Sequence, residues 1–309
     1  MIKIIEANSI DGKEYMKFLK KRTEDVQKDA NIIVDKILAD VRTRGDDAII
    51  EYTQKFDSKN ITLENFVVTD TEIKNAYKMV DQDFLDAITI AKANVTEFHE
   101  KQKRNGWMMT KEKGAILGQT VRGLESVGIY VPGGTASYPS SVIMNAIPAK
   151  VAGVENLVMV TPPLKDGTVN PHILVAADIA GVDKIYKIGG AQAIAGLAYG
   201  TENISKVDKI VGPGNIYVAM AKKSVFGSVA IDMIAGPSEI LIIADEFANQ
   251  HFIAADLMSQ AEHDVLASAM LITTSRDLAN KVVKELEIQI KEMSRYEIIK
   301  KSLEKYGVI

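Results

Sequence analysis

The amino-acid sequence predicts an α/β fold with parallel β-sheets, preceded by a largely helical stretch. From residue 128 onward, short apolar runs that end in glycine or proline alternate with segments of helical periodicity. Such alternation is typical of consecutive strand–loop–helix units in a parallel sheet. In the first hundred residues, apolar side chains recur instead at three- and four-residue steps, which indicates amphipathic helices. Because 309 residues exceed one ordinary core, two domains are expected.

Two long helical stretches are predicted before residue 105, over residues 13–55 and 70–104. The run Thr69-Asp70-Thr71 followed by Glu72 is a start signal for the second stretch. Lys113-Gly114 then separates two strand-like runs, which predicts a hairpin. Trp107, the single tryptophan, is interpreted as the core anchor of this hairpin.

The parallel sheet is predicted from four apolar runs that begin about 25 to 30 residues apart, each followed by a loop and a helix-like segment. These runs are GIYVPGG from residue 128, NLVMVTPP from 156, KIYKIGGAQ from 184 and KIVGPGN from 209. Farther along, we expect a strand over 239–244, a helix from near Phe247, a strand in AMLITT and helices over 276–306. Val308-Ile309 has the pattern of the first step of another strand.

Composition excludes several classes of protein. The chain has 37 basic and 41 acidic residues and no dense basic cluster, so a nucleic-acid partner is not expected. Its N-terminus is too polar for a signal peptide, and no apolar run approaches the roughly 18 to 20 residues of a membrane span. We therefore expect a cytoplasmic protein without membrane contacts. The chain has no cysteine, which excludes disulfides, cysteine-bound zinc and thiolate nucleophiles.

The glycine-rich loops are the first candidates for a binding site. Ligands of an open parallel sheet bind at the carboxyl ends of its strands, and helix N-termini at that edge suit phosphate groups. A nucleotide or another phosphorylated ligand is therefore a reasonable hypothesis. The spacing of these glycines matches neither the dinucleotide fingerprint nor a phosphate-binding P-loop. Plain turn glycines remain an equal alternative.

Three polar residues near the C-terminal end are further candidates. Ser238 precedes a strand and, without a GxSxG elbow around it, is interpreted as a turn or capping serine. Gln260 and His263 are three residues apart on a predicted helix, so both side chains can reach one point. An imidazole and an oxygen donor suit zinc, but two donors are fewer than a zinc site requires. The residues alone favour a solvated helix face over a metal site.

Four longer motifs point to one family. They are GIYVPGGTASYPSSVIMNAIPAKVAGV, KIGGAQAIAGLAYGTENISKVDKIVGPGNIYVAMAK, IDMIAGPSEILIIAD and DLMSQAEHD. In order and spacing, these motifs closely resemble the histidinol dehydrogenase family along essentially the whole chain. The resemblance implies a zinc-dependent oxidoreductase of histidine biosynthesis, which uses two NAD molecules to oxidise L-histidinol through the aldehyde to L-histidine.

The resemblance also implies roles for individual residues. Tyr130, Gln192 and Asn215 match the family's NAD contacts, and Ser238 matches its substrate-contacting serine. Gln260 and His263 match two zinc ligands that also orient the substrate. Members of the family form homodimers in which one zinc ligand comes from the partner subunit. Because there is no cysteine to form a thiohemiacetal, the second oxidation is expected to pass through the hydrated aldehyde.

The domain organisation that we expect rests partly on this resemblance. It comprises two Rossmann-like parallel-sheet domains, one inserted in the other, with a helical N-terminal arm. The arm covers residues 1–25, the first domain covers 26–127 with 238–309, and the inserted domain covers 128–237.

The first domain is expected to be incomplete at its C-terminal end, because family chains continue past residue 309. The continuation would supply the Glu-His pair for acid/base chemistry and two further zinc ligands, so we assign no catalytic residue within this chain. Two alternatives remain open. The chain could be a natural short paralogue that binds a nucleotide or an imidazole ligand without catalysis. It could also be another dehydrogenase with an unusual nucleotide fold, for which we find no candidate base.

Overall fold

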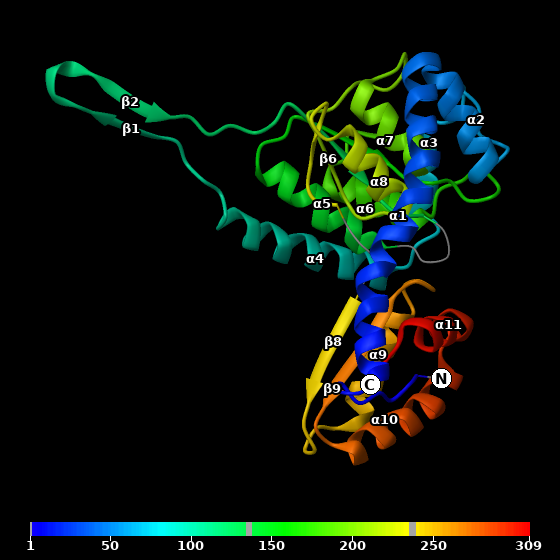
Figure 1. The fold of residues 1–309 in the computed structure, drawn as a ribbon. Helices are drawn as coiled ribbons and strands as arrows, with labels where there is room; N and C mark the ends of the chain where they lie inside the picture. The colour runs from blue at the N-terminus through cyan, green and yellow to red at the C-terminus, as the bar shows by residue number, and fades with distance from the viewer. Residues whose placement is uncertain (1, 134–137, 235–238) are drawn as a thin grey trace. The chain divides into compact units, whose positions relative to one another are not determined.

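The computed structural model describes residues 2–133, 138–234 and 239–309, apart from the side chains of residues 20–29. The chain forms two compact α/β units, one made of residues 27–235 and the other of residues 1–26 with 236–309 (Figure 1). The predicted division differs, because it placed residues 26–127 with the C-terminal segment. In the structure, helices from this stretch pack against helices that follow residue 128, so residues 27–127 belong with the sheet that comes after them.

The larger unit contains a five-stranded parallel sheet with the strand order β5-β4-β3-β6-β7. Four of its strands are those predicted from the apolar runs, and the short β7 is an addition. Their bounds are β3 (Ser126–Tyr130), β4 (Asn156–Val160), β5 (Lys184–Tyr186), β6 (Lys209–Val211) and β7 (Ala230–Ile231). The connecting helices are α5 (Pro139–Val151), α6 (Pro171–Ala180), α7 (Gly190–Tyr199) and α8 (Ile216–Val225). The predicted α/β class with a parallel sheet is confirmed.

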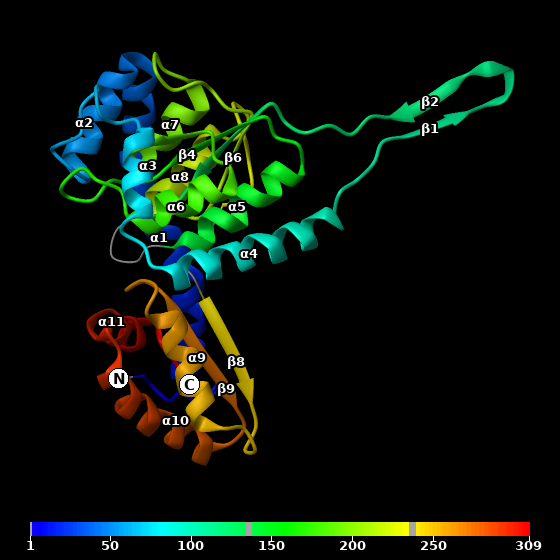
Figure 2. The same cartoon turned by 180° about the vertical axis from the view of Figure 1, so that it is seen from behind.

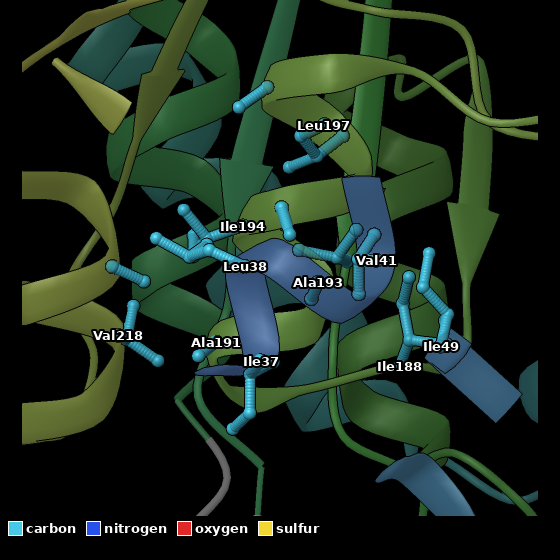
Figure 3. Packing of buried hydrophobic residues seen from close by; sticks show 14 of the residues in the cluster. Ile37, Leu38, Val41, Ile49, Ile188, Ala191, Ala193, Ile194, Leu197 and Val218 are labelled. Carbon is cyan, nitrogen blue, oxygen red and sulfur yellow. The ribbon is translucent and has the colours of Figure 1, made fainter. Parts of the chain in front are cut away.

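Each face of this sheet is covered by helices, which explains why its strands are apolar at nearly every position. Ile129 and Met159 belong to the core on one face, with residues of α3 (Asp70–Tyr77), α4 (Gln82–Glu100), α5 and α6. Tyr130 and Val160, the next residues along the strands, belong to the other core. That second core includes parts of α1 (Ile10–Arg44), α2 (Asp46–Phe56), α7 and α8, as Figure 3 shows for its central residues.

The first predicted helical stretch is divided in two at Gly45, between α1 and α2. Gly45 has a φ of 55°, and a Cβ at this position would lie 2.5 Å from a carboxylate oxygen of Glu202. Only glycine fits such a turn without strain. The start signal at Thr69 is confirmed, because Thr69 and Glu72 form a capping box at the N-terminus of α3.

The predicted hairpin is confirmed as strands β1 (Trp107–Thr110) and β2 (Ile116–Gln119), which pair antiparallel around the short 3-10 turn η1 (Glu112–Gly114). The interpretation of Trp107 as a core anchor is wrong. Its side chain is 54% exposed, and its ring N–H donates to Oε1 of Gln119 at 3.1 Å. All eight strand residues are exposed, and the hairpin extends away from the sheet of its own unit in both views (Figures 1 and 2). Among the described residues, no helix covers either face of the hairpin, so the tryptophan has no core to enter.

The smaller unit is built on the parallel pair β8 (Glu239–Ala244) and β9 (Ser268–Thr273), both close to their predicted positions. Its core is completed by α9 (Gln250–Ala261), α10 (Arg276–Gln289), the 3-10 turn η2 (Ile290–Glu292) and α11 (Tyr296–Tyr306). The strand step predicted at the last residues is present, because Val308 forms parallel bridges with Met270 and with Lys3. In the described part of the chain, none of the helices combines the length and the apolar character that crossing a membrane requires.

Candidate functional site

A cavity of about 690 Å³ lies in the larger unit, where β3 and β4 end and α7 and α8 begin. This edge of a parallel sheet is where ligands of such folds bind. Every lining residue lies between residues 33 and 217, within the unit formed by residues 27–235. The walls comprise Ile33, Ile37, Phe56 and Asp57 from the helical N-terminal part, and Tyr130, Pro132, Gly133, residues 162–165, residues 190–192, Asn215 and Tyr217 from the sheet edge.

Tyr130 ties the loops of this edge together. It is the last residue of β3, it is buried, and its hydroxyl oxygen accepts a hydrogen bond from the backbone N–H of Gly190 at 3.1 Å. A Cβ on Gly212 would lie 2.2 Å from the Tyr130 carbonyl oxygen, so only glycine lets the loop after β6 approach this closely. Burial raises the pKa of Tyr130. Its hydroxyl therefore keeps its proton and remains able to donate to a ligand.

Gln192 has an unusual environment. It lies in the first turn of α7 and is only 1% exposed, yet neither Nε2 nor Oε1 has a hydrogen-bond partner among the described residues. A Cβ on Gly190, whose φ is 62°, would lie 2.7 Å from Oε1 of Gln192, so the amide lies beside the helix N-terminus. Burying an amide without partners costs about 1–3 kcal/mol. A ligand that hydrogen-bonds this amide would recover that cost.

Asn215 is the N-cap of α8, and its Oδ1 accepts from the backbone N–H of Val218 at 3.1 Å. This bond orients the amide so that Nδ2 remains available to a ligand. The loop before it is held by Lys222, which is buried and donates both to the Gly212 carbonyl oxygen at 2.9 Å and to Asp232. Asp232 accepts in turn from the backbone N–H of Gly212 at 2.8 Å. Asn215 is therefore presented from a rigid loop.

Two cavity residues, Asp57 and Lys165, were not anticipated from the sequence. Asp57 follows α2, and its Oδ2 is buried without a partner among the described residues. Burial raises the pKa of this carboxyl group to about 6, although nearby Lys165 lowers it. Lys165 lies in the loop after β4, and its Nζ donates to the Asp57 backbone oxygen at 2.8 Å. No motif marks either residue, because they come from separate elements and meet only in the fold.

The candidate residues near the C-terminal end belong to the smaller unit. Ser238 lies outside the described residues. Gln260 lies in the last turn of α9, but the helix ends at Ala261, so His263 lies beyond it. The expectation that both residues share one helix is therefore wrong for His263, whose backbone N–H donates to the Gln260 carbonyl oxygen at 3.3 Å in the turn that ends the helix.

The metal-binding potential of this region is partial. An imidazole and an amide oxygen are suitable zinc donors, but they supply only two of the four ligands of a typical site. Within residues 2–133, 138–234 and 239–309, no three His, Asp or Glu side chains gather in metal-binding geometry. The other histidines have local partners: His99 contacts Gln102, His172 contacts Asn170 and His251 pairs with Glu285. Gln260 and His263 alone do not complete a zinc site.

The chemistry of the cavity suits a ligand with a flat apolar part and anionic groups. Ile33, Ile37 and Phe56 offer apolar walls. The N-termini of α7 and α8, which also border the cavity, carry partial positive charge, which favours phosphates. Unpartnered polar atoms of Gln192 and Asp57 add specific hydrogen-bonding capacity. Tyr130, Gln192 and Asn215 all line this cavity, so the structure brings together the three residues proposed as cofactor contacts.

Comparisons with known proteins identify similar chains. Residues 20–309 match the model of a family described as histidinol dehydrogenase. A histidinol dehydrogenase of Clostridium acetobutylicum is 60% identical over 311 aligned positions, which cover 100% of this chain and 71% of the relative. One from Bacillus cereus is 54% identical over 294 positions, covering 95% of this chain and 68% of the relative.

A solved structure agrees with these matches. The crystal structure of histidinol dehydrogenase from Elizabethkingia anophelis superimposes with a TM-score of 0.81 at 41% sequence identity. The match covers 90% of this chain and 64% of that one. This chain therefore spans roughly two thirds of the length of the relatives that it matches.

Proposed function

This chain belongs to the histidinol dehydrogenase family, and from that premise we propose that it binds NAD in the cavity between β3, β4, α7 and α8. The observation that carries the proposal is the buried amide of Gln192, which has no partner of its own and lines the cavity. Tyr130 and Asn215 would add a hydroxyl and an amide donor beside it. The apolar wall formed by Ile33, Ile37 and Phe56 would receive the adenine ring.

The reaction that we propose is the NAD-dependent oxidation of L-histidinol to L-histidine in two steps. In the first, the alcohol carbon transfers a hydride to NAD and the hydroxyl proton goes to a base, which gives the aldehyde. In the second, water adds to the aldehyde, and the hydrate transfers another hydride to a second NAD while a hydroxyl proton goes to a base, which gives the carboxylic acid of L-histidine. The chain has no cysteine to form a thiohemiacetal, which supports the hydrate route.

For the substrate and metal, we propose that Gln260 and His263 are zinc ligands that also orient histidinol, and that Ser238 contacts the substrate. Bound zinc would supply Lewis acidity at the substrate oxygen. Since two donors do not complete a zinc site, further ligands must come from outside this set, consistent with a homodimer in which one ligand crosses between subunits. No residue of this chain is proposed as the catalytic base.

The cofactor proposal is tested by titrating the purified chain with NADH and following nucleotide fluorescence. Gln192→Leu is expected to weaken NADH binding about tenfold or more, because the amide contributes hydrogen bonds worth roughly 1–2 kcal/mol. Gln54→Leu is the matched control: its Nε2 already donates to the Ile61 carbonyl oxygen at 2.7 Å, away from the cavity. Absence of NADH binding by the unaltered chain would overturn the proposal.

The reaction and the metal need separate readouts. NADH formation from L-histidinol and NAD in the presence of Zn²⁺ tests the oxidation, whereas binding without turnover would indicate a nucleotide-binding role alone. Calorimetric titration with Zn²⁺ tests the metal ligands. We expect weak binding that His263→Ala abolishes, because a two-donor site lacks the ligands that give zinc sites their affinity. Unchanged zinc binding in the variant would contradict the assignment of His263.

A further inference from the structure

We infer that Asp57 receives the adenosine ribose hydroxyls of the nucleotide and thereby rejects a nucleotide that carries a 2′-phosphate. The inference rests on the proposed function, because it assigns a further residue to the same NAD cavity. Nothing in the sequence marks Asp57 for this role. The structure does so through its position, its burial and its missing hydrogen-bond partner.

The backbone of Asp57 is fixed while its carboxylate remains unused. Lys165 donates from Nζ to the Asp57 carbonyl oxygen at 2.8 Å, and the hydroxyl of Ser58 donates to the Lys165 carbonyl oxygen at 2.9 Å. These two bonds join the end of α2 to the loop after β4. Asp57 nevertheless lines the cavity, and its buried Oδ2 lacks a partner among the described residues. Buried polar atoms without partners are rare, and each one calls for a specific explanation such as a ligand contact.

The chemistry of the site selects the kind of group that satisfies this carboxylate. An ionised carboxylate only accepts hydrogen bonds, so its partner must be a donor. A cationic donor is disfavoured here, because the same cavity contains Lys165 and the positive ends of two helices. Neutral hydroxyl groups are the remaining common donors, and a ribose offers two on adjacent carbons. An acidic residue that binds ribose hydroxyls is also the usual device of dinucleotide sites with other loop motifs.

The same carboxylate gives a physical basis for selectivity. A 2′-phosphate replaces a donor with a group that carries two negative charges and only accepts hydrogen bonds. Beside Asp57 it would meet like charge in a poorly hydrated site, where repulsion is strong. Removing the carboxylate would leave Lys165 as the nearest charged side chain of the cavity wall, which favours a phosphate. The raised pKa of Asp57, caused mainly by burial, agrees with a carboxylate that lacks solvation until a ligand supplies donors.

The test compares NADH with NADPH as fluorescent ligands of the full chain at pH 8. We expect the unaltered chain to prefer NADH by at least about tenfold. Asp57→Asn should weaken NADH binding about tenfold and reduce the preference to within about threefold, because the variant loses the negative charge and replaces one of the two acceptor oxygens with an NH2 donor. Glu64→Gln, which removes an equal charge from an exposed position outside the cavity, should change neither affinity. Adding Lys165→Met to Asp57→Asn should weaken NADPH binding relative to Asp57→Asn alone, because it removes the cation that favours the 2′-phosphate.

A ligand series on the unaltered chain makes the test independent of whether the variant folds. 5′-AMP should displace NADH more effectively than 2′-deoxy-AMP, since only the former has the 2′-hydroxyl. Equal displacement by the two, or an Asp57→Asn variant that binds both dinucleotides like the unaltered chain, would overturn the role of Asp57 while leaving the NAD site intact. If the unaltered chain binds neither NADH nor NADPH, the proposed function itself fails, and this inference fails with it.

Discussion

At the scale of single residues, the cavity contains buried polar atoms that have no hydrogen-bond partner among the described residues. Gln192, in α7, and Asp57, which follows α2, are more than a hundred positions apart in the sequence, yet both line the same cavity and have buried atoms without partners among the described residues. Outside the cavity, Lys222 is buried and hydrogen-bonded, and among the described residues only the hydroxyl of Thr53 is likewise buried without a partner. Because an unsatisfied buried group lowers the stability of the fold, Gln192 and Asp57 trade stability for binding capacity.

The raised pKa of Asp57 gives this trade a measurable pH dependence. Burial holds the pKa at about 6 in the folded chain, above its value of 3.8 without burial. The folded state therefore binds more protons than the unfolded state between these values, and stability falls as the pH rises through this window. In the Asp57→Asn variant this position does not ionise, so its stability does not fall over this pH window for this reason. We expect the variant to match the unaltered chain at pH 4 and to exceed its stability by about 1 kcal/mol at pH 8, after allowance for partial exposure.

Thermal melts of the two nucleotide-free chains from pH 4 to pH 8 measure this difference, with Glu64→Gln as the control for charge. Other titrating carboxyl groups are common to both chains, so the difference isolates Asp57. A gap that stays constant across the pH range would contradict the assigned titration.

At the scale of elements, the carboxylate of Glu72 caps helix α3 and also links this helix to the sheet through an ion pair. Oε2 of Glu72 accepts from the backbone N–H of Thr69 at 2.8 Å, which closes the capping box. Oε1 accepts from Nζ of Lys187 at 2.8 Å, and Lys187 is only 4% exposed just past the end of β5. Burial tends to raise the pKa of Glu72, but the bonds from Lys187 and Thr69 outweigh it and lower the pKa. This pair therefore stabilises the fold above the ordinary glutamate range and loses that effect in acid.

Removing the charge of Glu72 alone should lower the free energy of unfolding more than removing both charges of the pair. Glu72→Gln preserves an acceptor for the cap but leaves the Lys187 ammonium buried without a counter-charge, for which we expect a loss of about 3 kcal/mol. Lys187→Met should cost less, because Glu72 is partly exposed and keeps its bonds to Thr69. The double variant should be more stable than Glu72→Gln alone. Urea unfolding of the four chains gives the coupling energy, and strictly additive losses would refute the asymmetry.

The elements that the sequence predicts well are those set by local pattern. The four strands from residue 128 follow from apolar runs between glycine loops, and the start of α3 follows from Thr69 and Glu72. Two other expectations fail for non-local reasons. At the helix break, the carboxylate of the distant Glu202 lies beside Gly45 and accepts from the backbone N–H of Asp46. The exposure of Trp107 reflects the absence of any facing element among the described residues. Neither condition is visible in the neighbouring sequence.

At the scale of the whole molecule, the sequence locates the edge of the sheet that carries the site but not the walls that complete it. The glycine loops predict where Tyr130, Gln192 and Asn215 lie, because parallel strands end at a common edge. Asp57 and the apolar wall come from helices that precede the sheet by some seventy positions or more. The position of these residues at the cavity depends on packing between helices. The same packing places residues 27–127 in the larger unit.

The exposed hairpin has a consequence for how the polypeptide responds to a protease. Lys111 and Lys113 lie in its tip, and no helix in the described part of the chain protects the backbone between Lys101 and Arg122. Brief treatment with trypsin should therefore cut first within this stretch, since exposed and weakly packed segments are cleaved preferentially. On each side of the cut, α4 and α5 remain packed together over a shared core. The nicked chain should elute from a sizing column as one species and separate into two pieces only under denaturing conditions. The larger unit would then hold together without a continuous backbone through the hairpin.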